Sequence, residues 1–270
     1  MGRPRRVDAG GYVYHVLNRG NGRMTLFDDE SDYAAFERVL GEAVERSVAA
    51  PVAPGAGAIG VTLIAWCLMP NHWHLVLRTE RDGDLARFVR WLTLTHTQRW
   101  HAHHGTAGGG HVYQGRYKSF PVETERYLAM VCRYVERNPV QAKLCRTPEA
   151  WRWSSLWAWR EGPAALRDLI APWPGPGATH RAQRPTRWLS RVKTPLKRSE
   201  QEALQASFHR GRPLGSSPWQ TRMIEQFGLE STLRPRGRPK KRQADADSRN
   251  NGSRHLFSPR HLFSPSRGGI

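Results

Sequence analysis

Two apolar segments that meet at a proline–asparagine pair restrict the fold more than any other feature of the chain. VTLIAWCLMP (61–70) and HWHLVLRTE (72–80) have the composition of strands, and Pro70-Asn71 favours a turn between them. Strands joined by a tight turn pair in an antiparallel manner. The sequence therefore predicts an antiparallel sheet that contains this hairpin.

The remaining segments complete an α+β pattern. Strands are predicted over 11–20 and 116–124, and helices over 31–47, 84–104 and 125–144. Ser31 is expected to cap the first helix, and Pro139 to interrupt the last. The order of strands and helices predicts a ferredoxin-like antiparallel sheet with helices packed on one face.

A shift in charge and a Pro/Gly-rich run divide the chain. PWPGPG (172–177) suits neither a helix nor a central strand. The chain has 42 Lys+Arg against 23 Asp+Glu, net +19, and residues 181–270 contribute +14 of this with 20 basic and 6 acidic side chains. We predict a folded domain over 1–171, a linker over 172–180, and a basic, largely disordered tail over 181–270. The repeat RHLFSP, at 254–259 and 260–265, adds to that expectation.

The excess of positive charge predicts a polyanionic partner, with nucleic acid the leading candidate. The sequence has no run of about 18 apolar residues and no signal-peptide region at its start, so we expect a cytoplasmic, nucleoid-associated protein without a membrane partner. The three cysteines, Cys67, Cys132 and Cys145, are too scattered for a disulfide framework and are expected to be reduced.

A pair of histidines is the first candidate for chemistry. His72 and His74 flank Trp73 at the start of a predicted strand, where alternate side chains share a face and their Cα atoms lie roughly 6.5 Å apart. Two imidazoles can therefore face one cation, while Trp73 anchors the opposite face. The tripeptide alone is also compatible with two histidines that share a strand by chance and bind no metal. The other histidines, His96, His101, His103, His104 and His111, could form a second metal site, but solvated helix ends and loops fit them better, because a metal site needs supporting partners around its ligands.

A tyrosine and an asparagine four residues apart are the second candidate. Tyr134 and Asn138 share one face of a predicted helix, which suits a nucleophile beside a further metal ligand. Tyrosine attack on a phosphodiester gives a 5′-phosphotyrosine and a free 3′-OH. A packed core tyrosine and a helix-ending asparagine before Pro139 are an equally good interpretation of these two residues alone.

Several blocks together resemble the HUH-type single-tyrosine transposases, with IS200-like catalytic domains, and especially their REP-associated branch. The blocks are YHVLNRGNGRMTLFDDESDYAAF (14–36), WCLMPNHWHLVL (66–77), YQGRYKSFPVETERYL (113–128), CRYVERNPVQAKL (132–144) and WRWSS (151–155). They occur in the expected order over about the first 160 residues.

The resemblance implies a DNA endonuclease and strand transferase with a ferredoxin-like palm. It implies Mg²⁺ or Mn²⁺ on His72 and His74, Asn138 completing the metal site, and Tyr134 as nucleophile. Tyr127 is the rival nucleophile, but the residue four positions later is Val131, which cannot bind a metal. Single-stranded and hairpin DNA are the implied substrates, for a monomer or a homodimer.

Further DNA contacts are predicted at both ends of the chain. The candidates are Arg3, Arg5, Arg6, Asn18, Arg19 and Arg23 near the N-terminus, and Arg236, Gly237, Arg238 and Pro239 in the tail. The tail residues lie within 234–242, which looks like an AT-hook suited to the minor groove of duplex DNA. Solvated charge, or a basic tail without groove specificity, is the alternative.

Two other functions compete with the enzyme. A DNA-binding regulator could keep the fold without catalysis, although the intact histidine pair and tyrosine disfavour it. An RNA-binding ferredoxin-like module would need an exposed aromatic pattern on its sheet, which the sequence lacks. The candidate catalytic residues all lie before the Pro/Gly run. Residues 1–177 are therefore expected to cut DNA, and residues 178–270 to bind duplex DNA.

Overall fold

The computed structural model describes residues 6–48, 59–174 and 184–233. Four strands form one sheet: β1 (Val13–Arg19), β2 (Val61–Met69), β3 (His72–Thr79) and β4 (Lys118–Val122). The larger helices are α1 (Glu30–Val48), α2 (Asp84–His104), α3 (Arg126–Gln141), α7 (Arg198–Arg210) and α8 (Ser217–Phe227). Shorter helices are α4 (Ser155–Arg160), α5 (Ala164–Arg167) and α6 (Trp188–Lys193).

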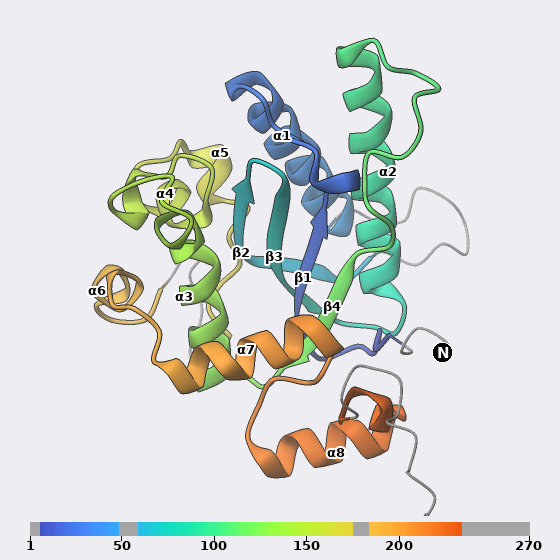
Figure 1. Cartoon of the computed structure of the whole chain (residues 1–270). Coiled ribbons are helices and arrows are strands. Elements are labelled where there is room, and N and C mark those ends of the chain that lie inside the picture. Colours follow the sequence, from blue (N-terminus) through green and yellow to red (C-terminus); the bar gives the residue numbers. More distant parts are fainter. Residues whose placement is uncertain (1–5, 49–58, 175–183, 234–270) are drawn as a thin grey trace, which may run out of the picture. The chain divides into compact units, whose positions relative to one another are not determined.

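The sheet has the topology that the sequence predicts. Its strand order is β2-β3-β1-β4, and all three pairings are antiparallel (Figure 1). The β2–β3 hairpin turns at Pro70-Asn71, and Met69 pairs with His72. Together with α1 and α2 in their places between strands, this order defines a ferredoxin-like fold and confirms the predicted class.

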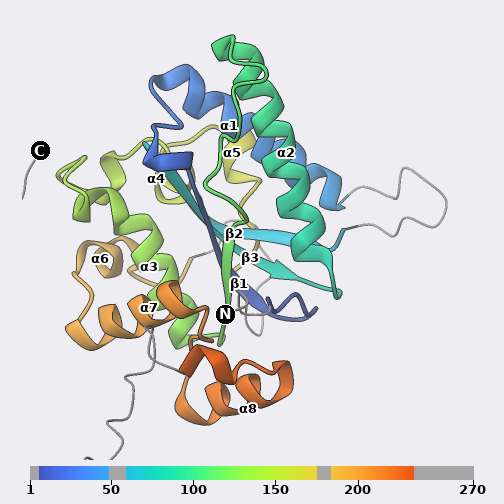
Figure 2. The same ribbon diagram turned by 45° about the vertical axis from the view of Figure 1, so that its right-hand side comes forward.

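One face of the sheet is covered by α1 and α2, as expected (Figures 1 and 2). Phe36 of α1 and Phe88 of α2 are buried in the same apolar cluster as Trp66 and Trp73 of the sheet. Burial of aromatic side chains of this size contributes strongly to stability, roughly 1.5–3 kcal/mol for each fully buried apolar side chain.

The opposite face is covered as well, which the prediction of helices on one face did not include. Val131 of α3, Trp188 of α6 and Leu204 of α7 are buried in a second cluster with Ile64 and Phe120 of the sheet. The cause lies in β2, which is apolar on both of its sides: eight of its nine residues are buried. A strand of this kind requires cover on two faces.

Two local details of the predicted helices were wrong. Asp29, not Ser31, caps α1, because its carboxylate accepts hydrogen bonds from the backbone N–H groups of Ser31 and Asp32. The last predicted helix continues through Pro139 to Gln141. A proline so near the end of a helix removes a single backbone donor, and α3 ends two residues later.

The structure also differs from the boundary predicted after residue 171. The first compact unit runs from Met1 to Arg234, and residues 184–233 form α6, α7 and α8. Buried Glu136 of α3 accepts hydrogen bonds from Arg184 at 2.9 Å and Trp188 at 2.7 Å, which ties this segment to the sheet domain. Short amphipathic helices rich in arginine resemble a disordered tail in composition, so the charge pattern was misleading.

Other expectations fall partly outside the described residues. These are the linker over 175–180, the AT-hook-like segment 234–242 and the repeat over 254–265. Cys67, Cys132 and Cys145 are free thiols, as expected. Among the described helices, none combines the length and the apolar character that a membrane span requires.

Candidate active site

Strand β3 presents His72 and His74 on the face of the sheet that α3 covers. Trp73 between them points to the other face, where it is fully buried. Its indole Nε1 donates to the hydroxyl of Tyr113 at 3.1 Å, and that hydroxyl lies 2.8 Å from Nδ1 of His96. The anchoring role predicted for Trp73 therefore has a structural basis. His96, expected in a solvated position, is instead buried behind it.

The two histidines lie together, with ring centroids 4.9 Å apart. Nδ1 of His72 is 2.6 Å from the side-chain oxygen of Asn71. Because a carbonyl oxygen only accepts, this Nδ1 carries the proton, and Nε2 keeps its lone pair. Nε2 of His74 lies 2.9 Å from the side-chain amide of Asn138 on α3. The predicted third ligand is therefore in contact with the histidine pair.

A third histidine, which the sequence analysis did not single out, completes this group. Nε2 of His15 on β1 lies 3.0 Å from Nδ1 of His74. His15 is fully buried, and its own Nδ1 has no hydrogen-bond partner among the described residues. A histidine in the apolar strand around 11–20 was the available signal, but its partner depends on how β1 pairs with β3.

Burial keeps all three imidazoles neutral near pH 7. It lowers the pKa of His72 to about 4, with help from the positive charge of Arg19, and the pKa of His15 to about 3. The pKa of His74 is held well below its ordinary value, also chiefly by burial. Neutral imidazole is the form that binds metal ions.

Tyr134 of α3 faces the same group. Its ring is perpendicular to that of His74, with centroids 5.7 Å apart. Burial raises the pKa of Tyr134 to about 12, and a hydrogen bond with Asn138 and the charge of Arg19 act in the opposite direction. Tyr134 is therefore a neutral phenol near pH 7. The guanidinium of Arg126 lies 5.9 Å from the centre of the Tyr127 ring. Among the described ring contacts, none joins Tyr127 to the histidines.

Helix α7 also contributes a side chain to the group formed by the histidines and Tyr134. The ring of Phe208 lies 5.0 Å from that of Tyr134 and 4.9 Å from that of His15, measured between centroids. The segment predicted to be a separate tail thus contributes a side chain to the candidate site. Sequence reasoning had no means to find it, because Phe208 has no motif and its position depends on the packing of α7 against β4.

Four of the predicted DNA contacts lie within the described residues. Arg19 pairs with His72 in the β1–β3 register, and Asn18 before it is buried. Arg23 is exposed in the short turn that follows. The guanidinium of Arg6 lies 4.1 Å from the ring centre of Tyr117, so it is ordered against the domain. The candidates Arg3, Arg5, Arg236, Gly237, Arg238 and Pro239 lie outside the described residues.

A family model covers the part of the chain that forms the sheet and this cluster. Residues 11–138 match the family model described as "Transposase IS200 like". The matched range contains the whole sheet and every side chain from His15 to Asn138 that forms the cluster. Residues 11–138 therefore belong to the IS200-like transposase family, as the sequence blocks implied.

Two solved structures are similar to this chain. One, titled as a REP-associated tyrosine transposase bound to a REP hairpin, has 18% identity, a TM-score of 0.46, and coverage of 67% of this chain and 98% of its own. A putative transposase from Deinococcus radiodurans R1 has 18% identity and a TM-score of 0.33, over 53% of this chain and 95% of its own. No curated protein matches the chain. The family assignment accordingly depends on the match over residues 11–138.

Proposed function

We propose that this transposase cuts and rejoins DNA strands with Tyr134 as nucleophile and a divalent cation, Mg²⁺ or Mn²⁺, on His72, His74 and Asn138. The observation that supports this most directly is the convergence of a helix-borne phenol, an amide and two neutral imidazoles between α3 and β3. These residue types supply a nucleophile and metal ligands for phosphoryl transfer.

The ring nitrogens fit a cation. Nδ1 of His72 and Nδ1 of His74 are both engaged by protein atoms, so the ligand atom of each ring would be Nε2. Nε2 of His74 lies 2.9 Å from the Asn138 amide nitrogen, and it becomes available to an ion once that amide turns. Rotation of the Asn138 side-chain amide by 180° exchanges its nitrogen and oxygen, so that the oxygen lies beside His74. Amide oxygens and imidazoles suit Mg²⁺ and Mn²⁺. When bound, the ion would neutralise charge on the scissile phosphate.

His15 supports this arrangement as a positioning residue. If Nδ1 of His74 donates to Nε2 of His15, the lone pair of His74 stays on Nε2, facing Asn138. The proton of His15 then resides on Nδ1, the atom without a partner among the described residues. The cost of that unpaired donor is consistent with a residue selected for what it does to His74.

In the proposed reaction the hydroxyl oxygen of Tyr134 forms a bond to the scissile phosphorus, and the bond from that phosphorus to the 3′ oxygen breaks. The phenolic proton passes to solvent, and the 3′ oxygen takes up a proton. The phosphodiester energy is kept in the 5′-phosphotyrosine, so attack by a 3′-OH rejoins a strand and releases Tyr134.

The proposed substrate is single-stranded or hairpin DNA, the class that the resemblance to REP-associated transposases implies. We expect Arg19 to contact a phosphate near the nucleophile, because it pairs with His72 across β1 and β3 and its charge influences Tyr134. The basic segment beyond residue 234 would add affinity for duplex flanks.

Incubation of the full chain with labelled single-stranded hairpins from the flanks of its own gene, with and without Mn²⁺, tests this proposal. We expect cleavage and a covalent protein–DNA adduct only with the ion. Tight hairpin binding with neither product would identify a DNA-binding regulator instead.

A further inference from the structure

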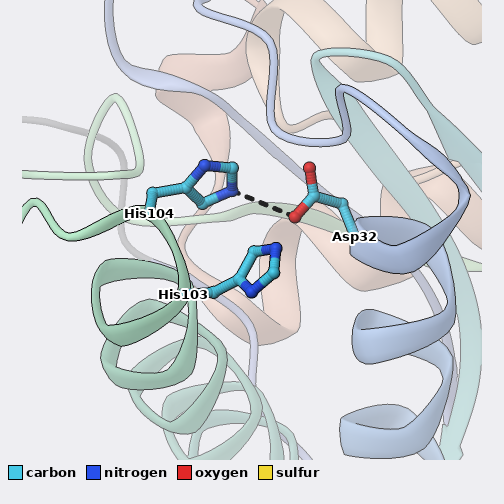
Figure 3. A group of neighbouring side chains, drawn as sticks. All are labelled: Asp32, His103 and His104. Atoms are coloured by element: carbon cyan, nitrogen blue, oxygen red, sulfur yellow. Dashed lines mark hydrogen bonds and ion pairs between the residues drawn. The ribbon is translucent and has the colours of Figure 1, made fainter.

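A second group of possible metal ligands lies where the first turn of α1 meets the last turn of α2 (Figure 3). It consists of Asp32, His103 and His104, whose ligand atoms all lie within 4.8 Å of one another. We propose that this group, the α1–α2 histidine cluster, binds a divalent cation of the zinc type. The cluster shares no residue with the candidate active site, so this inference is independent of the proposed function.

The ligand set suits zinc. Two imidazole nitrogens and one carboxylate oxygen occur in three-ligand zinc sites, with a fourth position open to water. Zinc–ligand bonds of about 2.0–2.2 Å place the ligand atoms of a tetrahedral site roughly 3.3 Å apart. Nε2 of His104 and Oδ1 of Asp32 are already 3.0 Å apart. The ligand atom of His103 lies within 4.8 Å of the other two, and the side chain is exposed and therefore free to approach them.

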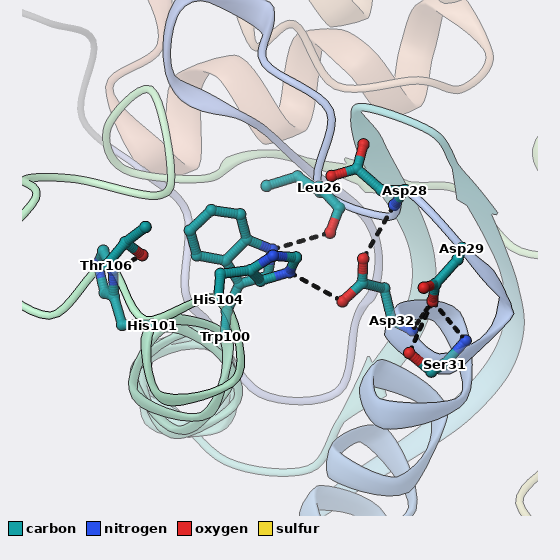
Figure 4. A network of polar contacts seen from close by, with 9 residues as sticks. All are labelled: Leu26, Asp28, Asp29, Ser31, Asp32, Trp100, His101, His104 and Thr106. Atoms are coloured by element: carbon teal, nitrogen blue, oxygen red, sulfur yellow. Dashed lines mark hydrogen bonds and ion pairs between the residues drawn. The ribbon is translucent and has the colours of Figure 1, made fainter.

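Asp32 is held in place by the backbone. It is 5% exposed, and its second oxygen, Oδ2, accepts a hydrogen bond from the N–H of Asp28 at 2.9 Å. The oxygen that faces His104 is therefore presented at a fixed position (Figure 4). Fixed ligands of this kind reduce the entropy that a metal site must lose on binding.

His104 is held in place by a tryptophan. The ring of Trp100, one turn earlier on α2, lies against it with centroids 4.2 Å apart and planes inclined by 31°. Trp100 is itself fixed, because its indole Nε1 donates to the backbone oxygen of Leu26 at 3.0 Å (Figure 4). Two of the three ligands are thus ordered before any ion binds, unlike the solvated helix-end histidines that the sequence predicted.

The local charge also favours a cation. Asp32 is accompanied by Asp28 and Asp29 in the same turn, within a chain whose net charge is +19. Asp29 and His103 are close enough for their charges to interact. An ion pair between His104 and Asp32 would account for only two members of the cluster. A cation uses all three.

The bound ion would join the start of α1 to the end of α2. The loop after α2 is held by His101, whose ring nitrogens lie 2.8 Å from the hydroxyl of Thr106 and 3.1 Å from the backbone oxygen of Gly110. This loop leads to Tyr113, which is hydrogen bonded to Trp73. The role that we infer is structural: the ion stabilises the elements behind the strand that carries His72 and His74.

The test uses Co²⁺ as a probe, because tetrahedral Co²⁺ absorbs visible light, followed by displacement with Zn²⁺. The protein is the full chain, stripped of metal, with the substitutions His72→Ala and His74→Ala to remove the other candidate ligands. We expect one equivalent of Co²⁺ with a tetrahedral spectrum that Zn²⁺ abolishes. Addition of His103→Ala should weaken binding by at least about tenfold. His111→Ala, at an exposed histidine outside the cluster, is the matched control and should bind like the parent.

His103 is exposed, so its replacement is not expected to disturb folding, and circular dichroism checks this. If the doubly substituted parent proves unstable, the number of Zn²⁺ equivalents is compared in the otherwise unchanged chain with and without His103→Ala, where we expect one equivalent fewer in the variant. Absence of Co²⁺ and Zn²⁺ binding at micromolar concentration, or equal binding with and without His103, would overturn the proposal and leave an ordinary ion pair.

Discussion

The side-chain amide of Asn138 lies 2.9 Å from Nε2 of His74. This contact joins α3 to β3, and Tyr134 is one helical turn before Asn138 on the same face. The position of the phenol relative to the histidines is therefore set by two rigid elements, not by a loop. A site built in this way keeps its geometry when single ligands are replaced, which makes substitution experiments informative.

Removal of either proposed metal ligand should abolish divalent-dependent cleavage. His72→Ala or His74→Ala takes away one imidazole that faces the proposed ion, whereas the basic side chains proposed to contact DNA remain. Cleavage of a labelled hairpin at several Mn²⁺ concentrations and a binding assay on the same hairpin measure the two effects. Full cleavage by either variant would refute the assignment of the metal site.

Replacement of His15 should lower the affinity for the ion without removing any of its ligands. His15→Phe leaves Nδ1 of His74 without its acceptor, and loss of such supporting contacts typically reduces metal affinity by about 10–100-fold. The Mn²⁺ concentration that gives half-maximal cleavage should rise accordingly. His15→Gln restores an acceptor and should recover part of the affinity. Equal Mn²⁺ requirements in the wild type and His15→Phe would show that His15 only fills space.

Acid should destabilise the metal-free protein through these histidines. Burial lowers the pKa of His72 to about 4 and of His15 to about 3, whereas an unfolded histidine has a pKa of about 6.5. Below pH 6.5, roughly, the unfolded chain binds protons that the folded chain does not, so the free energy of unfolding falls as the pH decreases toward about 4. Melting temperatures between pH 8 and 4 measure this effect. Over this range the melting temperature of His15→Phe should fall less than that of the wild type. Parallel curves would contradict it.

The division between chemistry and duplex binding should fall near residue 234. Residues 235–270 contain nine basic and two acidic side chains. A chain ending at Arg234, the limit of the first compact unit, should cut a hairpin at saturating concentration but bind duplex flanks more weakly. The slope of log affinity against log salt should flatten by about 0.9 for each lost phosphate contact. An unchanged slope in a salt titration would refute the binding role.

A chain ending at residue 177 should be unstable. The Pro/Gly run, in contrast, led to the expectation that residues 1–177 fold and cut DNA. It removes Arg184 and Trp188, the partners of buried Glu136, and removal of a partner from a buried ion pair costs about 3–5 kcal/mol. Denaturant unfolding of the two truncated chains compares their stabilities. Equal stability would show that α6 and α7 are dispensable to the fold.

Local patterns in the sequence predicted most of the sheet and which of the central candidate residues share a face. Alternation on β3 places His72 and His74 on one face, and the four-residue spacing on α3 places Tyr134 beside Asn138. His15 and Phe208 escaped prediction because their partners are determined by strand register and by the packing of a later helix. The cover of the second sheet face was missed because charge dominated the composition of 184–233, although the apolar residues of β2 already required it.

The most direct test of the account identifies the residue that becomes joined to DNA. The full chain is incubated with a 3′-labelled hairpin substrate, whose labelled end stays on the protein after cleavage, and Mn²⁺, alongside Tyr134→Phe and Tyr127→Phe, and the adduct is resolved by denaturing electrophoresis and peptide mapping. Because Tyr134→Phe removes only the hydroxyl, folding and metal binding should persist while the adduct disappears. Tyr127→Phe should form the adduct as the wild type does, with DNA on Tyr134. An adduct that survives in Tyr134→Phe, or is lost in Tyr127→Phe, would contradict the proposed nucleophile.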